Sequence, residues 1–291
     1  MNDLSVVLAV KNEEDNLARC LKSVKSIADE IIVFDDGSTD DTIAIANKFG
    51  AKVTKYQRKG NFHETKQQAI NAASCTWVLQ LDADEVVTQE LANEIKEVIQ
   101  EGADLIKIQK QKEEIYLRKW RLFERHQQTV EKRDGIFGNK DDSIVAFFIP
   151  RKNIFLGKAL IYGGVYPDPA IRLFKKGKAY LPAKNVHEIM KVDGKVGWLF
   201  ADLEHHDSPT LKRYLERANR YTDLTAQQLK IKKIKKNTTT LFLYTMIKPT
   251  KTFLMLYFRH LGILDGIRGF LWAFFSAMHH SIAYWKYWVG S

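Results

Sequence analysis

The sequence predicts an α/β protein with a doubly wound, mostly parallel sheet, followed by a helical and amphipathic C-terminal extension. Strand-like apolar segments alternate with helical patterns over the first hundred residues. Clusters of acidic residues come directly after two of these strands. From Ser208 onward the chain is basic and rich in aromatic side chains. These three observations define the fold class before any motif is considered.

The elements of the N-terminal part follow from their hydrophobic periods. Strands, marked by short continuous apolar runs, are expected at residues 4–10, 30–34, 52–56 and 76–81. Helices, marked by apolar residues three or four positions apart, are expected at residues 12–25, 40–49, 62–73 and 88–101. Strands joined through helices run parallel, so their carboxyl ends meet at one edge of the sheet. Ligands bind at that edge in such sheets.

The pattern after residue 105 is less regular. Short strands are expected at residues 105–109 and 170–174, and a charged helix at 209–229. Residues 115–146 are charged and contain no motif that we can assign, so the acceptor of any reaction cannot be inferred from them. Cys20 and Cys75 are isolated and lack metal-ligand spacing, which indicates small buried side chains in a reducing compartment.

Net charge divides the chain into two parts. The whole chain has a formal charge of +10. Residues 208–291 hold 14 Lys and Arg against 3 acids, which is +11, so residues 1–207 carry about −1. We therefore predict a catalytic domain over residues 1–207 and a basic, membrane-associating extension over residues 208–291.

Three carboxylates end the strand in the segment WVLQLDADE at 77–85. Asp82 and Asp84 are two positions apart and therefore point to the same side of an extended backbone, and Glu85 follows them. Clustered carboxylates repel each other unless a cation or a hydrogen-bond donor neutralises them. The usual solution is Mg²⁺ or Mn²⁺, held by one or two carboxylates and by phosphate oxygens of the substrate. The alternative is a solvated acidic turn.

Three motifs occur in order with helices between them: KNEE at 11–14, DDGSTDDT at 35–42 and LDADE at 81–85. Through these motifs, residues 4–90 resemble family 2 glycosyltransferases, which have the nucleotide-sugar-binding GT-A fold. The resemblance implies inverting, metal-dependent transfer of a hexose from a nucleotide diphosphate sugar. A looser resemblance, carried by RKNIFLGKALIYGGVYPDPAIRLFKKGKAY and VHE, is to the bacterial lipopolysaccharide-core β-glucosyltransferase-like branch. It implies UDP-glucose as donor and a lipid-linked or cell-envelope saccharide as acceptor.

The resemblance also implies roles for single residues. The nucleotide-sugar contacts are expected from Ala9, Val10, Asn12, Glu13, Asp35, Asp36, Lys66, Asp82 and Arg172. Asp36, or Asp35 in its place, would accept hydrogen bonds from the nucleobase, and Lys66 would face a phosphate of the nucleotide. Arg172 would position phosphates or orient the catalytic base, or would instead pair with a nearby acid.

Metal binding and proton transfer involve a second set of residues. Asp84 resembles the direct metal ligand, and Asp82 the acid that contacts the ribose or a metal-bound water. His187 is a further candidate for a metal or phosphate contact. Inversion requires a base near the acceptor hydroxyl. Glu188, in NVHE, is the first candidate for this base, and Asp168, in YPDPAIRLF, is its competitor.

The C-terminal part suggests a membrane surface. Its longest stretch without Lys, Arg, Asp or Glu is 269–285, near the lower limit for a spanning helix. Amphipathic helices in the interface fit better, with the lysines of KIKKIKK at 230–236 on anionic lipid. The alternative is a helical pair packed on the catalytic domain. The N-terminus lacks a signal-peptide pattern, so we expect a cytoplasmic protein, peripheral on the inner face of the cytoplasmic membrane.

Two other functions are weighed against glycosyl transfer. A nucleotidyltransferase of related fold typically carries a glycine-rich phosphate loop after the first strand, but this chain has KNEEDN there, without glycine. A non-enzymatic protein could bind RNA or a membrane through its aromatic and lysine-rich tail. That function leaves the acidic motifs unexplained, so no nucleic-acid partner is expected.

Overall fold

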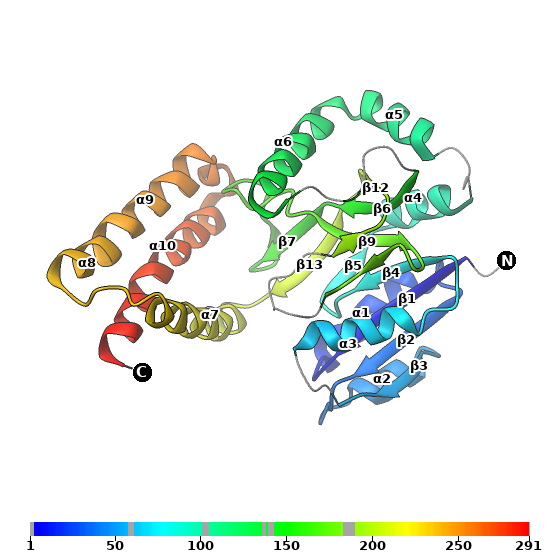
Figure 1. Ribbon diagram of the computed structural model, residues 1–291, viewed down its shortest axis with the longest axis horizontal. Helices are drawn as coiled ribbons and strands as arrows, with labels where there is room; N and C mark the ends of the chain where they lie inside the picture. The colour runs from blue at the N-terminus through cyan, green and yellow to red at the C-terminus, as the bar shows by residue number, and fades with distance from the viewer. Residues whose placement is uncertain are drawn as a thin grey trace. The chain divides into compact units, whose positions relative to one another are not determined.

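The computed structural model of the protein describes residues 3–57, 61–100, 105–135, 138, 143–182 and 190–290 (Figure 1). The chain forms two compact units. The larger unit comprises Met1–Arg151 and Pro167–His205, and the smaller one Lys152–Tyr166 and His206–Ser291. The smaller unit thus includes an internal segment, Lys152–Tyr166, as well as the C-terminal residues.

A mixed sheet forms the centre of the larger unit. Within the described residues it has seven strands, in the order β12-β6-β9-β4-β1-β2-β3. Their bounds are β1 (Leu4–Val10), β2 (Glu30–Asp35), β3 (Lys52–Lys55), β4 (Trp77–Leu81), β6 (Ile144–Ile149), β9 (Ala170–Lys175) and β12 (Lys195–Trp198). Neighbours are parallel except where β9 runs antiparallel to β4 and β6. The predicted strand at residues 170–174 is confirmed as β9.

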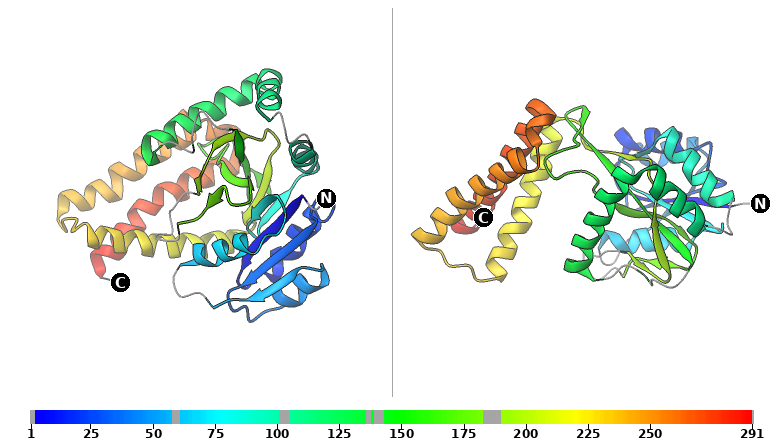
Figure 2. Two further views of the ribbon diagram at one scale, coloured as in Figure 1. Left: turned by 45° about the vertical axis from the view of Figure 1, so that its right-hand side comes forward. Right: turned by 90° about the horizontal axis from the view of Figure 1, so that it is seen from above.

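Helices cover both faces of this sheet. Figures 1 and 2 show α3 (Phe62–Asn71) on the face opposite α1 (Glu14–Val24) and α2 (Thr42–Lys48). The chain winds from β1 to β3 in one direction and then returns to β4. Right-handed crossovers place the returning helix on the other face. Every residue of β1 is consequently buried, as expected of a central parallel strand.

The predicted strand at residues 105–109 is wrong. These residues begin α5 (Leu105–Ile115), which follows α4 (Gln89–Gln100) and precedes α6 (Leu117–Asp134). Leu105 and Ile108 are buried at helical spacing, and a short apolar run of this kind does not distinguish a strand from a helix. More than half of residues 115–146, which contain no recognisable motif, form α6. Phe123 of this helix stacks on Trp198, with the ring centroids 4.5 Å apart.

Short strands complete the larger unit. β5 (Glu85–Val87) pairs antiparallel with β13 (Leu203–Ser208), and the register places His205 opposite Glu85. β10 (Ala179–Tyr180) pairs with β11 (Lys191–Val192). β7 (Arg151–Phe155), which lies in the smaller unit except for its first residue, pairs with β8 (Lys158–Ala159) as a hairpin. The β5–β13 pairing matters most for the site, because it brings a distant histidine to the acidic motif.

The rest of the smaller unit is helical. Its elements are α7 (Leu211–Ile231), α8 (Thr238–Phe242), the π-helix η1 (Leu243–Ile247), α9 (Lys248–Leu254), the π-helix η2 (Met255–Arg259), the 3₁₀-helix η3 (Gly262–Asp265) and α10 (Gly266–Val289). α10 packs against both α7 and α9 (Figure 2). No single helix within the described ranges is long and apolar enough to cross a bilayer. The segments Thr238–Arg259 and Gly262–Val289 meet that requirement only when taken as a pair, and this pair is bent by 73°.

Candidate active site

The loops after β1 and β2 are joined into one rim. Asn12 has a left-handed backbone (φ 54°), which asparagine tolerates better than most residues. Its N–H donates to Ser38 Oγ (2.9 Å), and its Oδ1 accepts from the N–H of Thr39 (2.8 Å). The N–H of Glu13 donates to Thr42 Oγ1 (2.8 Å). Two predicted loops, distant in sequence, therefore form one preorganised structure at the carboxyl edge of the sheet.

The two aspartates at the end of β2, Asp35 and the following Asp36, make different contacts. The carboxylate of Asp35 is buried and accepts from the N–H groups of Gly37 (3.2 Å) and Ser38 (3.1 Å), so it holds the turn. Asp36 is also buried, and its N–H donates to the carbonyl of Val10 (2.9 Å). Because the carboxylate of Asp35 is used within the turn, this geometry favours Asp36 over Asp35 as the acceptor of hydrogen bonds from a nucleobase. Ala9 and Val10 are buried residues of β1 beside this rim.

The carboxylate of Asp82 lies between two cations. One oxygen forms an ion pair with Lys66 from α3, and the other with Arg172 Nη2 from β9 (2.6 Å). Burial alone would raise the pKa of Asp82, but Arg172 and then Lys66 hold it well below its usual value. The structure thus brings three predicted site residues together. It also shows the ion pair of Arg172 with an acid that sequence reasoning left as an alternative.

Glu85 extends this arrangement into the interior. Its side chain is fully buried: Oε1 lies 2.6 Å from Arg172 Nη2 and 3.5 Å from Arg151 Nη1, and Oε2 accepts from the N–H of Asp82 (2.9 Å). Arg151 Nη2 in turn lies 2.9 Å from Asp168 Oδ2. We call this series Asp82, Arg172, Glu85, Arg151 and Asp168 the acid–arginine chain. Burial opposes the charge of Arg172, yet Asp82 and Glu85 raise its pKa above the ordinary value.

Asp84 lies beside a histidine that sequence reasoning missed. Its Oδ2 is 3.6 Å from His205 Nε2, and the two side chains are 18% and 14% exposed. The described residues contain no group of three or more acidic, cysteine or histidine side chains placed to hold a metal. The carboxylate of Asp84 nevertheless suits Mn²⁺ or Mg²⁺ when diphosphate oxygens and water supply other ligands. The imidazole of His205 favours a transition-metal ion over the harder Mg²⁺. The motif LEHHDS at 203–208 was the available signal, but its spatial partner is set only by the β5–β13 register.

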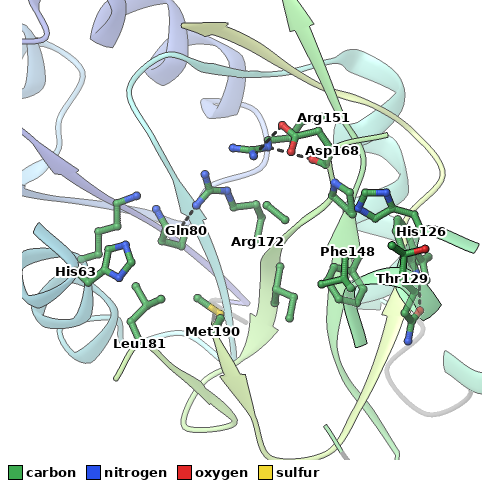
Figure 3. Close-up of a pocket in the computed structure, with 17 residues that line it drawn as sticks. His63, Gln80, His126, Thr129, Phe148, Arg151, Asp168, Arg172, Leu181 and Met190 are labelled. Atoms are coloured by element: carbon green, nitrogen blue, oxygen red, sulfur yellow. Dashed lines mark hydrogen bonds and ion pairs between the residues drawn. The ribbon is translucent and has the colours of Figure 1, made fainter. Parts of the chain in front are cut away.

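A cavity of about 560 Å³ opens beside Lys66 and Arg172, which line it. Figure 3 shows Gln80, Arg172 and His63 on one side, with Phe148, His126 and Thr129 on the other. The last two come from α6, the helix whose sequence carried no assignable motif. Leu181 and Met190 also line the cavity, whereas His187 and Glu188, which lie between them in sequence, fall outside the described residues.

Asp168 is the predicted base that the structure describes. It lines the cavity, between Pro167 and Pro169, and its backbone is left-handed (φ 38°). A residue before proline avoids the helical region, and a non-glycine residue at positive φ is uncommon, so the surrounding contacts must hold this conformation. The ion pair with Arg151 and the donation from Arg151 Nε to the Asp168 carbonyl (3.2 Å) provide those contacts.

Comparison with known proteins gives the family. The model of glycosyl transferase family 2 matches residues 5–161, more than half of the chain, so this protein belongs to that family. The family and the mostly parallel sheet confirm the predicted GT-A-type fold. The resemblance to family 2 was therefore correct.

Individual relatives match to different extents. A glycosyltransferase of Rickettsia typhi without a characterised function is 44% identical over 98 residues, which cover 33% of this chain and 32% of that protein. A TPR repeat-containing protein of Synechococcus elongatus is 32% identical, covering 66% and 47%. The chain thus spans a third to a half of these relatives. The lipopolysaccharide core biosynthesis glycosyltransferase LpsC of Rhizobium meliloti is 24% identical, covering 94% and 90%.

Among solved structures, the glucosyl-3-phosphoglycerate synthase of Mycobacterium tuberculosis, in complex with Mn²⁺, uridine diphosphate and glucosyl-3-phosphoglycerate, is similar to part of the chain. The match is 32% identical and covers 29% of this chain and 34% of that chain, with a TM-score of 0.26.

Proposed function

We propose that this protein is an inverting, metal-dependent glycosyltransferase that moves a hexose from a nucleotide diphosphate sugar to a saccharide acceptor. The observation that carries the proposal is the meeting of Asp82, Lys66 and Arg172 at the carboxyl edge of a family 2 sheet, with Asp84 two residues further on beside His205. UDP-glucose is the proposed donor. The name of the Rhizobium meliloti relative supports an acceptor in the lipopolysaccharide core or another envelope saccharide, presented by a lipid.

The geometry suggests how the chain would hold the donor. Asp36 would accept from the base in the rim formed by the first two loops. Asp84 and His205 would hold Mg²⁺ or Mn²⁺, which supplies positive charge to the departing diphosphate. Lys66 lines the cavity and would add a second cation on the phosphate side, while its ion pair keeps Asp82 ionised. Cations and hydrogen-bond donors that are already held where negative charge develops in the transition state usually make the largest single contribution to catalysis.

The acceptor hydroxyl requires a base on the face of the sugar opposite the diphosphate. We propose Glu188 for this role. Asp168 is the alternative, supported by its place in the cavity and its strained backbone. Its ion pair with Arg151 speaks against it, because the arginine occupies a carboxylate oxygen that would have to accept the proton.

Donor recognition can be tested by thermal unfolding with sugar nucleotides, with and without Mn²⁺. We expect UDP-glucose with Mn²⁺ to stabilise the protein, by about 2.7 kcal/mol at a hundredfold excess over Kd. Asp36→Ala should lose most of this stabilisation. Asp41→Ala, an exposed acid of the same loop, should keep it. If no sugar nucleotide stabilises the protein, with or without Mn²⁺, the proposal fails. Release of pyrophosphate from UTP and glucose 1-phosphate, in place of UDP release from UDP-glucose, would favour the nucleotidyltransferase.

The two candidate bases can be separated by isosteric variants. Glu188→Gln is expected to bind the donor normally but to lose turnover about 10²-fold or more, because it removes the proton acceptor. Asp168→Asn should retain most of its turnover. Donor affinity from calorimetry and kcat from UDP release provide the two readouts. The assignment is reversed if Asp168→Asn loses turnover at unchanged affinity while Glu188→Gln does not.

A further inference from the structure

A bend in the smaller unit exposes an unusual number of large apolar side chains. We call residues 254–270, where Thr238–Arg259 turns by 73° into Gly262–Val289, the elbow. Phe258, Leu264 and Ile267 are 53%, 60% and 65% exposed there, and Leu254 and Leu261 are also exposed. Single exposed apolar residues are ordinary, but a contiguous group of this kind marks an interaction site.

Two of the three formally charged side chains of the elbow bond within the unit, and the third, Arg259, is exposed. The carboxylate of Asp265 accepts from the N–H groups of Ile161 (3.3 Å) and Tyr162 (2.9 Å). Arg268 Nε donates to the carbonyl of Leu156 (2.9 Å). A protein surface in water usually shows the reverse arrangement, with charges outward and apolar groups inward. Here Asp265 and Arg268 are used within the unit, so Arg259 is the one formally charged side chain of the elbow that is left exposed.

The internal segment of the smaller unit belongs to the same surface. The N–H of Gly163 donates to the carbonyl of His260 (2.9 Å), which fastens this segment to the elbow. Gly163 and Gly164 have φ values of 67° and 73°, which other residues rarely adopt. Ile161 and Tyr162, next to these glycines, are 40% and 38% exposed. The paired glycines of the sequence thus add an aliphatic and an aromatic side chain to the exposed face.

The elbow is held in its bent form by close backbone contact. A Cβ atom at Gly269 would overlap the carbonyl oxygen of Gly262. A Cβ atom at Gly262 would lie 2.8 Å from the carbonyl oxygen of Leu256. Since only glycine permits these approaches, the apolar face is a built feature of the unit.

We propose that the elbow, together with Ile161 and Tyr162, inserts into the interfacial layer of a lipid bilayer and anchors the protein there without crossing it. The occupant is lipid for two reasons. A protein interface of ordinary size carries about one hydrogen bond per 100–200 Å², whereas the polar groups of Asp265 and Arg268 are turned away from this face. Residues 208–291 also carry a formal charge of +11, which attracts anionic headgroups to the unit that bears the elbow.

The proposal goes beyond sugar transfer and is tested without donor or acceptor. The full chain is sedimented with vesicles of phosphatidylcholine, alone or mixed with phosphatidylglycerol. Leu264→Ser combined with Ile267→Ser should weaken partitioning to both kinds of vesicle by about tenfold or more, because buried aliphatic area is lost. Ile115→Ser is the matched control: this residue is 73% exposed but lies on α5 of the larger unit. It should partition like the parent chain.

Salt separates the elbow from general charge attraction. Binding of the parent chain to neutral vesicles should persist at high salt, since burial of apolar groups is not screened. Unchanged partitioning of the double variant, with circular dichroism equal to that of the parent, would overturn the proposal. So would loss of self-association, measured by light scattering, without loss of vesicle binding, because the face would then serve a second copy. Phe258→Ser provides an independent variant if the double variant does not fold.

Discussion

Replacing Asp84 by asparagine is expected to abolish measurable sugar transfer while the protein stays folded. The side chain is only 18% exposed, but asparagine has nearly the same volume as aspartate. The change therefore removes the charge and hardly alters the packing. A cation held with His205 would lose its carboxylate ligand. We expect kcat to fall by about 10²–10³-fold or more, the magnitude seen when one preorganised charge-stabilising group is removed.

The experiment needs a control for the loss of a negative charge. Asp193→Asn removes an acid that is 75% exposed and pairs with Lys178 at 2.8 Å, so it should leave transfer unchanged. Transfer is measured as UDP release during titration with Mn²⁺. Normal turnover of the Asp84 variant at low Mn²⁺ would exclude this residue as a metal ligand.

Replacing Arg172 by methionine is expected to cause the largest loss of stability in the larger unit. The arginine is buried and lies 2.6 Å from both Asp82 and Glu85. Without it, two carboxylates lose a cation in an environment of low dielectric constant. Removal of one partner from a buried ion pair typically costs about 3–5 kcal/mol. Lys178→Met, which breaks an exposed pair, should cost below about 1 kcal/mol.

The pH dependence of this loss has a defined sign. Asp82 has a pKa well below 3.8 in the folded protein, so its ionisation contributes stability above pH 3.8 that disappears as the pH falls. Loss of Arg172 raises this pKa. The difference in unfolding free energy between parent and variant should therefore be largest near neutral pH and shrink below about pH 4. Urea unfolding at several pH values tests this. A variant no less stable than Lys178→Met would contradict the structural role of Arg172.

The accuracy of the sequence-based prediction depends on the distance over which each feature is determined. Apart from the three-residue β5, the strand and helix order up to residue 100 follows from local periodicity, and the family motifs marked the loops of the rim and the acidic strand end. His205 could not be found in this way, because only the register of β13 against β5 brings it to Asp84. Arg151 was missed for a similar reason: it joins the site through Glu85, which the chain places 66 residues earlier.

The insertion of β9 between β4 and β6 is a second feature that local patterns do not contain. It runs antiparallel to both neighbours and places Arg172 beside Gln80 and Asp82. The roles of Arg172 therefore remained open at the sequence level. The incorrect strand at residues 105–109 has a different cause, since its apolar run was too short to distinguish two periods.

The acid–arginine chain limits how such an enzyme could be redesigned. Glu85 serves two arginines, one beside the metal-motif acid Asp82 and the other beside the cavity acid Asp168. Loss of the buried Arg172 or Glu85 alone leaves a charge stranded in the interior, so variation there requires matched pairs of changes. Thr129 and Val130 on α6 face the same cavity from outside this series. A library that reshapes this cavity should therefore begin on that helix, where single substitutions leave the ionic framework intact.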